Sequence, residues 1–111
     1  MNVIAPDRAR EMRHAFHDSL AEAQEAIMRG YVREGWVNLD LAHDLLDVLG
    51  WNDCEPETPV PVEGVVPVLE RYADGFRNIV DETGDPGERE RAKVMVVLIA
   101  AMVSLVTDDA C

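Results

Sequence analysis

The stretch that decides the fold is Val94–Val106, VMVVLIAAMVSLV, in which Ser104 is the only polar residue. As a helix it spans about 20 Å, short of the ~30 Å hydrocarbon core of a bilayer. It therefore belongs to a protein core or to a protein interface, not to a membrane span. It sits in a predicted helix over 86–107, whose start is marked by Asp85 as N-cap, Pro86 in the first turn and Glu88 as a first-turn acid.

Upstream of this helix, apolar residues recur at steps of three and four over three further segments. These segments predict helices over 7–29, 32–49 and 65–82, with Gly30 and Gly50 as helix C-caps. The first two helices are joined by only two or three residues, so we expect them to be antiparallel neighbours. Pro67 is expected in the first turn of its helix, where proline is tolerated.

Between the second and third helices, Pro56, Pro59 and Pro61 favour an extended connection. No strand is expected, because alternation of apolar and polar residues is confined to this short loop. A chain of 111 residues has room for one hydrophobic core. We therefore predict an all-α fold: a small four-helix antiparallel bundle, with residues 1–111 as a single helical domain and a proline-rich loop between the second and third helices.

The composition is that of a folded, acidic protein. Apolar residues make up 48% of the chain, and 22 acidic residues against 10 basic ones give a formal net charge of −12. Phosphate backbones and anionic lipids would repel such a chain, so no direct nucleic-acid contact and no membrane contact are expected. The first residues lack the pattern of a secretory signal, which predicts a cytoplasmic protein. Cys54 and Cys111 are interpreted as free thiols, although a bond between them stays open.

The helix over 86–107 is apolar on every side from Val94 onward. In a small bundle each helix turns one side to solvent, so such a helix either is wrapped by the other three or forms an interface. Self-association is the default form of that interface, because closed two-fold pairs are the commonest soluble assembly. We expect a homodimer, whose shared face could also serve a partner. The candidate interface residues are Val94, Met95, Val97, Leu98, Ala101, Met102 and Leu105.

The charge is unevenly spread, since no Lys or Arg lies between Arg33 and Arg71. This region either keeps the protein soluble or guides it to a basic surface, such as that of a nucleic-acid-binding protein. Three aromatic residues nearby either cap the core or act as binding contacts. The candidate acidic residues are Asp40, Asp44, Asp47, Asp53, Glu55 and Glu57, and the aromatic ones are Tyr31, Trp36 and Trp51.

Two carboxylate–histidine pairs have the three-residue spacing seen in di-iron helical bundles: Glu11 with His14, and Asp40 with His43. Glu11 and His14 lie nearly opposite the apolar side of their helix, whereas di-iron ligands point inward. No glycine-rich phosphate loop, nucleophile motif or HExxH pattern occurs. We therefore predict no catalytic residue, no metal site and no cofactor, and we do not expect an enzyme.

The expected function is that of a small acidic regulator that acts by protein–protein interaction. It would be an antagonist or anti-activator, binding a regulatory protein such as a transcription factor and blocking its dimerisation or DNA binding. Two alternatives stay open. One is an acidic nucleic-acid mimic that inhibits a DNA-binding protein or nuclease, and the other is a small helical metal-binding protein or enzyme.

Overall fold

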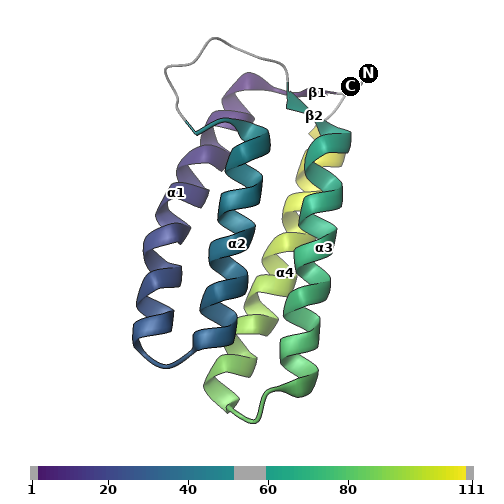
Figure 1. Ribbon diagram of the computed structural model, residues 1–111. Helices are drawn as coiled ribbons and strands as arrows, with labels where there is room; N and C mark the ends of the chain where they lie inside the picture. The colour runs from purple at the N-terminus through teal and green to yellow at the C-terminus, as the bar shows by residue number, and fades with distance from the viewer. Residues whose placement is uncertain (1–2, 52–59, 110–111) are drawn as a thin grey trace.

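The computed structural model describes residues 3–51 and 60–109, and four helices account for most of them (Figure 1). The helices are α1 (Pro6–Met28), α2 (Val32–Leu49), α3 (Val62–Glu82) and α4 (Pro86–Asp109). They run alternately up and down, because short turns join α1 to α2 and α3 to α4. The predicted all-α four-helix bundle is confirmed.

The core is built from the apolar sides that the sequence periodicity indicates. Helix α1 packs on α2, α2 on α3, and α3 on α4, whereas α2 and α4 meet only narrowly. The innermost side chains are those of Leu41, Leu45, Leu69, Phe76 and Ile99, all completely buried. Because α2 packs against both α1 and α3, its buried residues cover a wide arc of the helix.

The turns follow from the residues at the helix ends. Gly30 and Gly50 adopt φ values of +99° and +97°, a region that favours glycine, after the last residues of α1 and α2. At the start of α4, the Asp85 side chain accepts hydrogen bonds from the backbone N–H groups of Gly87 and Glu88, at 2.8 and 3.3 Å. Asp85 is therefore the N-cap that the sequence predicts.

The expectation of no strands is wrong for two short segments. Val3–Ile4 (β1) and Val60–Pro61 (β2) pair antiparallel, with Val3 opposite Pro61 and Ile4 opposite Val60. Ile4 and Val60 are both 5% exposed, so the pair covers one end of the core. Each strand has only two residues, which is too few to produce an alternating pattern of apolar and polar residues. The two strands also lie far apart in the sequence, so no local pattern predicts their pairing.

Helix α3 also begins three residues earlier than predicted, at Val62, which places Pro67 beyond the first turn. Val62 explains the early start, because its side chain is buried and continues the apolar side of the helix. Pro67 has no N–H, so it cannot donate a hydrogen bond to the carbonyl oxygen of the preceding turn. Because Pro67 is exposed, water can reach that carbonyl oxygen.

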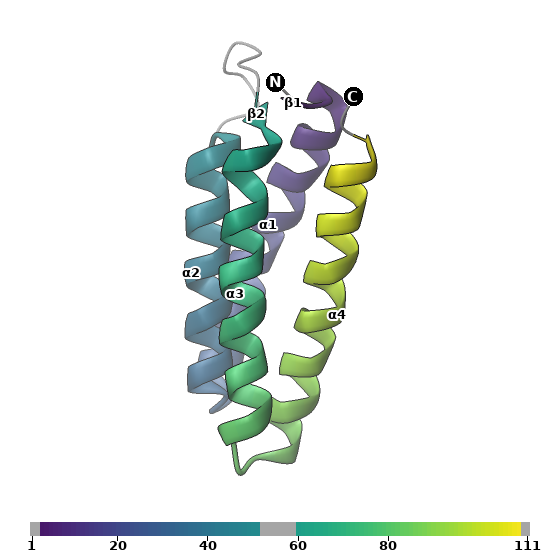
Figure 2. The same cartoon turned by 90° about the vertical axis from the view of Figure 1, so that its right-hand side faces the viewer.

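Helix α4 is not the central helix. It lies along one side of the bundle beside α3 (Figure 2), and several of its large apolar side chains remain exposed. The alternative in which the other three helices wrap α4 on all sides is therefore excluded. None of the described helices is long and apolar enough to cross a lipid bilayer.

Candidate protein-binding surfaces

An apolar stripe runs along the outer side of α4. We use this name for Val94, Val97, Leu98, Ala101 and Leu105. The four larger side chains are 56%, 68%, 49% and 40% exposed in chain order, and Ala101 is exposed between them. Their spacing of three and four residues places them on neighbouring turns of one side of the helix. Two other predicted interface residues, Met95 and Met102, are half-buried and pack against the core.

The inner side of α4 carries a polar network at its N-terminal end. The side chain of Glu34 in α2 is 1% exposed, and it accepts a hydrogen bond of 3.1 Å from Nε of Arg91 in α4. The guanidinium carbon of Arg91 also lies 5.6 Å from the centre of the Tyr31 ring. Tyr31, predicted as a partner contact, is thus half-buried and engaged within the chain.

Two further polar side chains are buried next to this network. Glu88 accepts hydrogen bonds from the Thr83 hydroxyl at 2.7 Å and from the backbone N–H of Glu34 at 3.3 Å. Asn38 is 4% exposed, with Nδ2 only 3.9 Å from the sulfur of Met95, and no described residue donates a hydrogen bond to its Oδ1. The burial of these groups is not predicted from the sequence, although Glu34 and Asn38 share the helical spacing of Leu41 and Leu45 on the buried side of α2.

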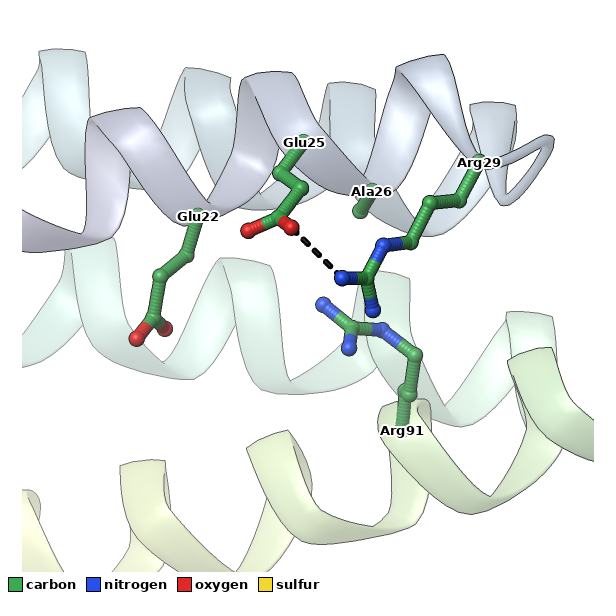
Figure 3. A pocket seen from close by; sticks show the side chains of 5 residues that line it. All are labelled: Glu22, Glu25, Ala26, Arg29 and Arg91. Atoms are coloured by element: carbon green, nitrogen blue, oxygen red, sulfur yellow. Dashed lines mark hydrogen bonds and ion pairs between the residues drawn. The ribbon is translucent and has the colours of Figure 1, made fainter.

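A small pocket of about 200 Å³ lies where α1 faces the first turns of α4 (Figure 3). Its volume falls below the ~300 Å³ at which small-molecule sites usually begin. Arg29 is paired with Glu25 at 2.6 Å, and Arg91 is held by Glu34, so both cationic groups on its walls already have acidic partners. The pocket therefore offers little to a small ligand. Its lining residues are Glu22, Glu25, Ala26, Arg29 and Arg91.

On α2, the predicted acidic and aromatic residues come together along the outward side. We call Trp36, Asp40, His43, Asp47 and Trp51 the acidic–aromatic face. All five are exposed, and helical spacing places the four that belong to α2 on neighbouring turns. Trp36 and Trp51 are 52% and 41% exposed, which is unusual for the largest apolar side chain. Asp53, Glu55 and Glu57 lie outside the described residues.

Trp51 is held in place at one end of this face. Its indole N–H donates a 2.7 Å hydrogen bond to Asp47, and its backbone oxygen lies 2.9 Å from Nε2 of His17 in α1. The rings of His17 and His43 both meet Trp51 edge to face, with centroid distances of 5.9 and 5.3 Å. A fixed aromatic ring loses little entropy when a partner covers it.

Asp44 differs from the other acids of α2, because it points toward α3. It accepts a short hydrogen bond from the Tyr72 hydroxyl, and Arg71 lies 4.0 Å from the same carboxylate. Burial, together with the hydrogen bond to Asp44 and the charges of Asp44 and Asp40, raises the pKa of Tyr72 to about 12. Asp44 therefore tethers α2 to α3, in addition to contributing charge.

Within 3–51 and 60–109, one group of side chains has atoms close enough to share a metal ion: His43, Asp44 and Asp47, within 4.8 Å of one another. Sequence analysis had considered His43 with Asp40 instead. In this group Asp44 already accepts a hydrogen bond from Tyr72, and Asp47 accepts one from Trp51. His43 and Asp47 are also exposed, so the group lacks the buried, fully ligated geometry of structural metal sites.

The acidic–aromatic face and the apolar stripe look in different directions. Helices α2 and α4 touch each other across the core, through Glu34 with Arg91 and through Asn38 with Met95. The two surfaces belong to different helices, and neither includes the side chains that join α2 to α4. The molecule thus presents an acidic, aromatic surface on α2 and an uncharged, apolar one on α4, on different flanks.

Comparison of the chain with protein families, with curated proteins and with solved structures found no match.

Proposed function

We propose that this protein is a non-enzymatic regulator that binds a basic surface of another protein through the acidic–aromatic face of α2. The observation that carries the proposal is the alignment of Trp36, Asp40 and Asp47 on one exposed side of α2, with Trp51 exposed just after the end of the helix. Carboxylates draw a basic partner in and set its orientation. Exposed tryptophans supply the apolar contact area that most often dominates binding energy.

The chemistry of the face indicates what kind of partner it fits. Large basic surfaces on proteins are commonly those that contact nucleic acid, because phosphate backbones demand them. A regulator that covers such a surface blocks DNA binding by competition. We therefore propose an antagonist or anti-activator of a regulatory protein such as a transcription factor. A nucleic-acid mimic would present an unbroken row of carboxylates, whereas Trp36, His43 and Trp51 interrupt the acids here.

The proposal is tested by capture from the native cell on three immobilised baits. The first is the wild-type chain, and the second carries Trp36→Ala, Asp40→Asn and Asp47→Asn. The third carries Asp18→Asn and Glu22→Gln on the exposed side of α1. It therefore loses two negative charges, as the second bait does, but from a different helix. Mass spectrometry then identifies the retained proteins.

The expected result is a DNA-binding protein retained by the wild-type and α1-variant baits and lost from the α2-variant bait. Once purified, that protein should release a labelled DNA duplex when wild-type chain is added, as followed by fluorescence anisotropy. Equal retention on all three baits, or a retained protein whose DNA binding is unaffected, overturns the proposal.

A further inference from the structure

The apolar stripe of α4 has no role in the proposed function, yet it remains exposed along about 17 Å of helix from Val94 to Leu105. No charged residue occurs between Lys93 and Asp108 in the sequence. A contiguous apolar surface of this kind marks an interaction site. The question is which molecule covers it.

We propose that the apolar stripe is covered by the same stripe of a second copy of this chain, with the two α4 helices antiparallel about a two-fold axis. Such a contact is isologous and closed, which limits the assembly to a dimer. The inference concerns a different flank from the acidic–aromatic face, and it holds or fails independently of the proposed function.

Charge does not prevent a second copy from covering the stripe. Each chain carries a formal charge of −12, so two copies repel each other wherever their acidic surfaces meet. The side of α4 from Val94 onward has no charge of its own and therefore adds no repulsion at the contact. A basic partner would be drawn instead to the acids of α2.

The arrangement of large and small side chains fits the antiparallel direction. With the axis midway between Leu98 and Ala101, Leu98 of each copy lies against the small Ala101 of the other. Val94 then meets Leu105 in the same way. In a parallel pair, Ala101 would face Ala101 and leave a gap beside Leu98. Antiparallel helices also place opposite macrodipole ends together.

The size of the stripe sets the expected strength. Its four large side chains are each only about half exposed, which makes the contact smaller than the ~800 Å² per partner of a standard interface. We therefore expect a reversible dimer with a dissociation constant in the range of about 1 to 100 µM.

The test uses two adjacent alanines of α4 that are both exposed. Ala101 lies in the stripe, whereas Ala100 lies about 100° around the helix from it. Ala101→Glu and Ala100→Glu therefore make the same chemical change on the same helix, inside and outside the proposed contact. Sedimentation velocity under reducing conditions, over about 1 to 500 µM protein, measures the assembly state.

The expected result is a dimer for the wild type and for Ala100→Glu, with the dissociation constant raised at least about 30-fold for Ala101→Glu. Circular dichroism should show the same helix content for all three. Should Ala101→Glu unfold, Val97→Glu replaces it, because Val97 is 68% exposed. A wild-type chain that stays monomeric at the highest concentration, or a dimer that both glutamates leave intact, overturns the proposal.

The direction of the helices is tested by a spin label at Glu90, in a chain whose cysteines at 54 and 111 are replaced by serine. An antiparallel pair separates the two copies of residue 90 by about 30 Å, whereas a parallel pair brings them to about 10 Å. Pulsed electron spin resonance distinguishes these distances. A short distance rejects the antiparallel arrangement.

Discussion

At the scale of single residues, the interior of this bundle is less apolar than its sequence suggests. Glu34 is almost fully buried, and its charge is balanced by Arg91, which reaches it from α4. Asn38 lies one turn further along the same side of α2. Ionic groups inside a core add little net stability as a pair, but removing one partner leaves the other buried and uncompensated. The effect of Glu34 and Arg91 on the free energy of unfolding is therefore measurable only when one of the two is replaced.

Arg91→Met should lower the free energy of unfolding by about 2 kcal/mol, because it leaves the Glu34 carboxylate buried without its cation. The value is reduced from that of a fully buried pair, since the Arg91 side chain is 38% exposed. The double variant Glu34→Met with Arg91→Met should recover most of the loss. Urea denaturation of both variants and the wild type measures this, and a double variant less stable than Arg91→Met contradicts it.

Tyr72 predicts a loss of stability at alkaline pH. Its pKa of about 12 in the folded chain exceeds the ordinary value of 10.0, so the folded state favours the neutral phenol. That contribution is complete below pH 10 and is lost as pH rises from 10 to 12. Two pKa units correspond to about 2.7 kcal/mol, and solvent screening of this partly exposed phenol lowers the expected loss to about 2 kcal/mol. Thermal unfolding measured from pH 9 to 12 should show this fall in the wild type and a smaller one in Tyr72→Phe. Parallel profiles for the two chains would contradict the assignment.

At the scale of elements, two glycines inside helices have opposite roles. Gly35 in α2 lies against α1, where a Cβ atom would come within 2.5 Å of Ile27 Cγ1 and 2.9 Å of the Ala23 carbonyl oxygen. Gly75 in α3 has room, because a Cβ atom there would meet Val37 at 3.5 Å, an ordinary contact. Of these two glycines, only Gly35 requires the absence of a side chain for packing.

Gly35→Ala should destabilise the fold by about 1 to 3 kcal/mol, because the backbones of α1 and α2 must separate to admit the methyl group. Gly75→Ala should stabilise it by about 0.5 to 1 kcal/mol, because alanine is the better helix former and nothing clashes. Chemical denaturation of the two variants and the wild type measures whether each substitution lowers or raises the free energy of unfolding. Stabilisation by both substitutions would mean that α1 and α2 are less closely packed than described.

At the scale of the whole molecule, the two flanks differ in the physics of their contacts. Carboxylates dominate the acidic–aromatic face, and their attraction to a basic partner is screened by salt. The apolar stripe has no charge to screen, while the repulsion between two copies of −12 weakens as salt is added. Ionic strength therefore acts on the two contacts in opposite directions.

Between about 50 and 500 mM salt, we expect affinity for the basic partner to fall at least about tenfold. Dimerisation over the same range should stay constant or strengthen, because salt screens the repulsion between the two acidic copies and the stripe itself has no charge. Sedimentation velocity follows the dimer, and anisotropy of the labelled partner follows the other contact. A dimer that dissociates as salt rises would place charged residues in the self-contact.

The sequence by itself determined the four helices, their buried sides, the glycine turns and the Asp85 cap, because each depends on residues within a few positions of one another. It also determined that α4 is apolar all round. Only the tertiary structure decided which side of α4 stays exposed, since that depends on how far α1, α2 and α3 reach around it. The same holds for the contact of Glu34 with Arg91, 57 residues apart, and for the pairing of Ile4 with Val60. Local periodicity cannot report such contacts, because they form only when distant segments pack together.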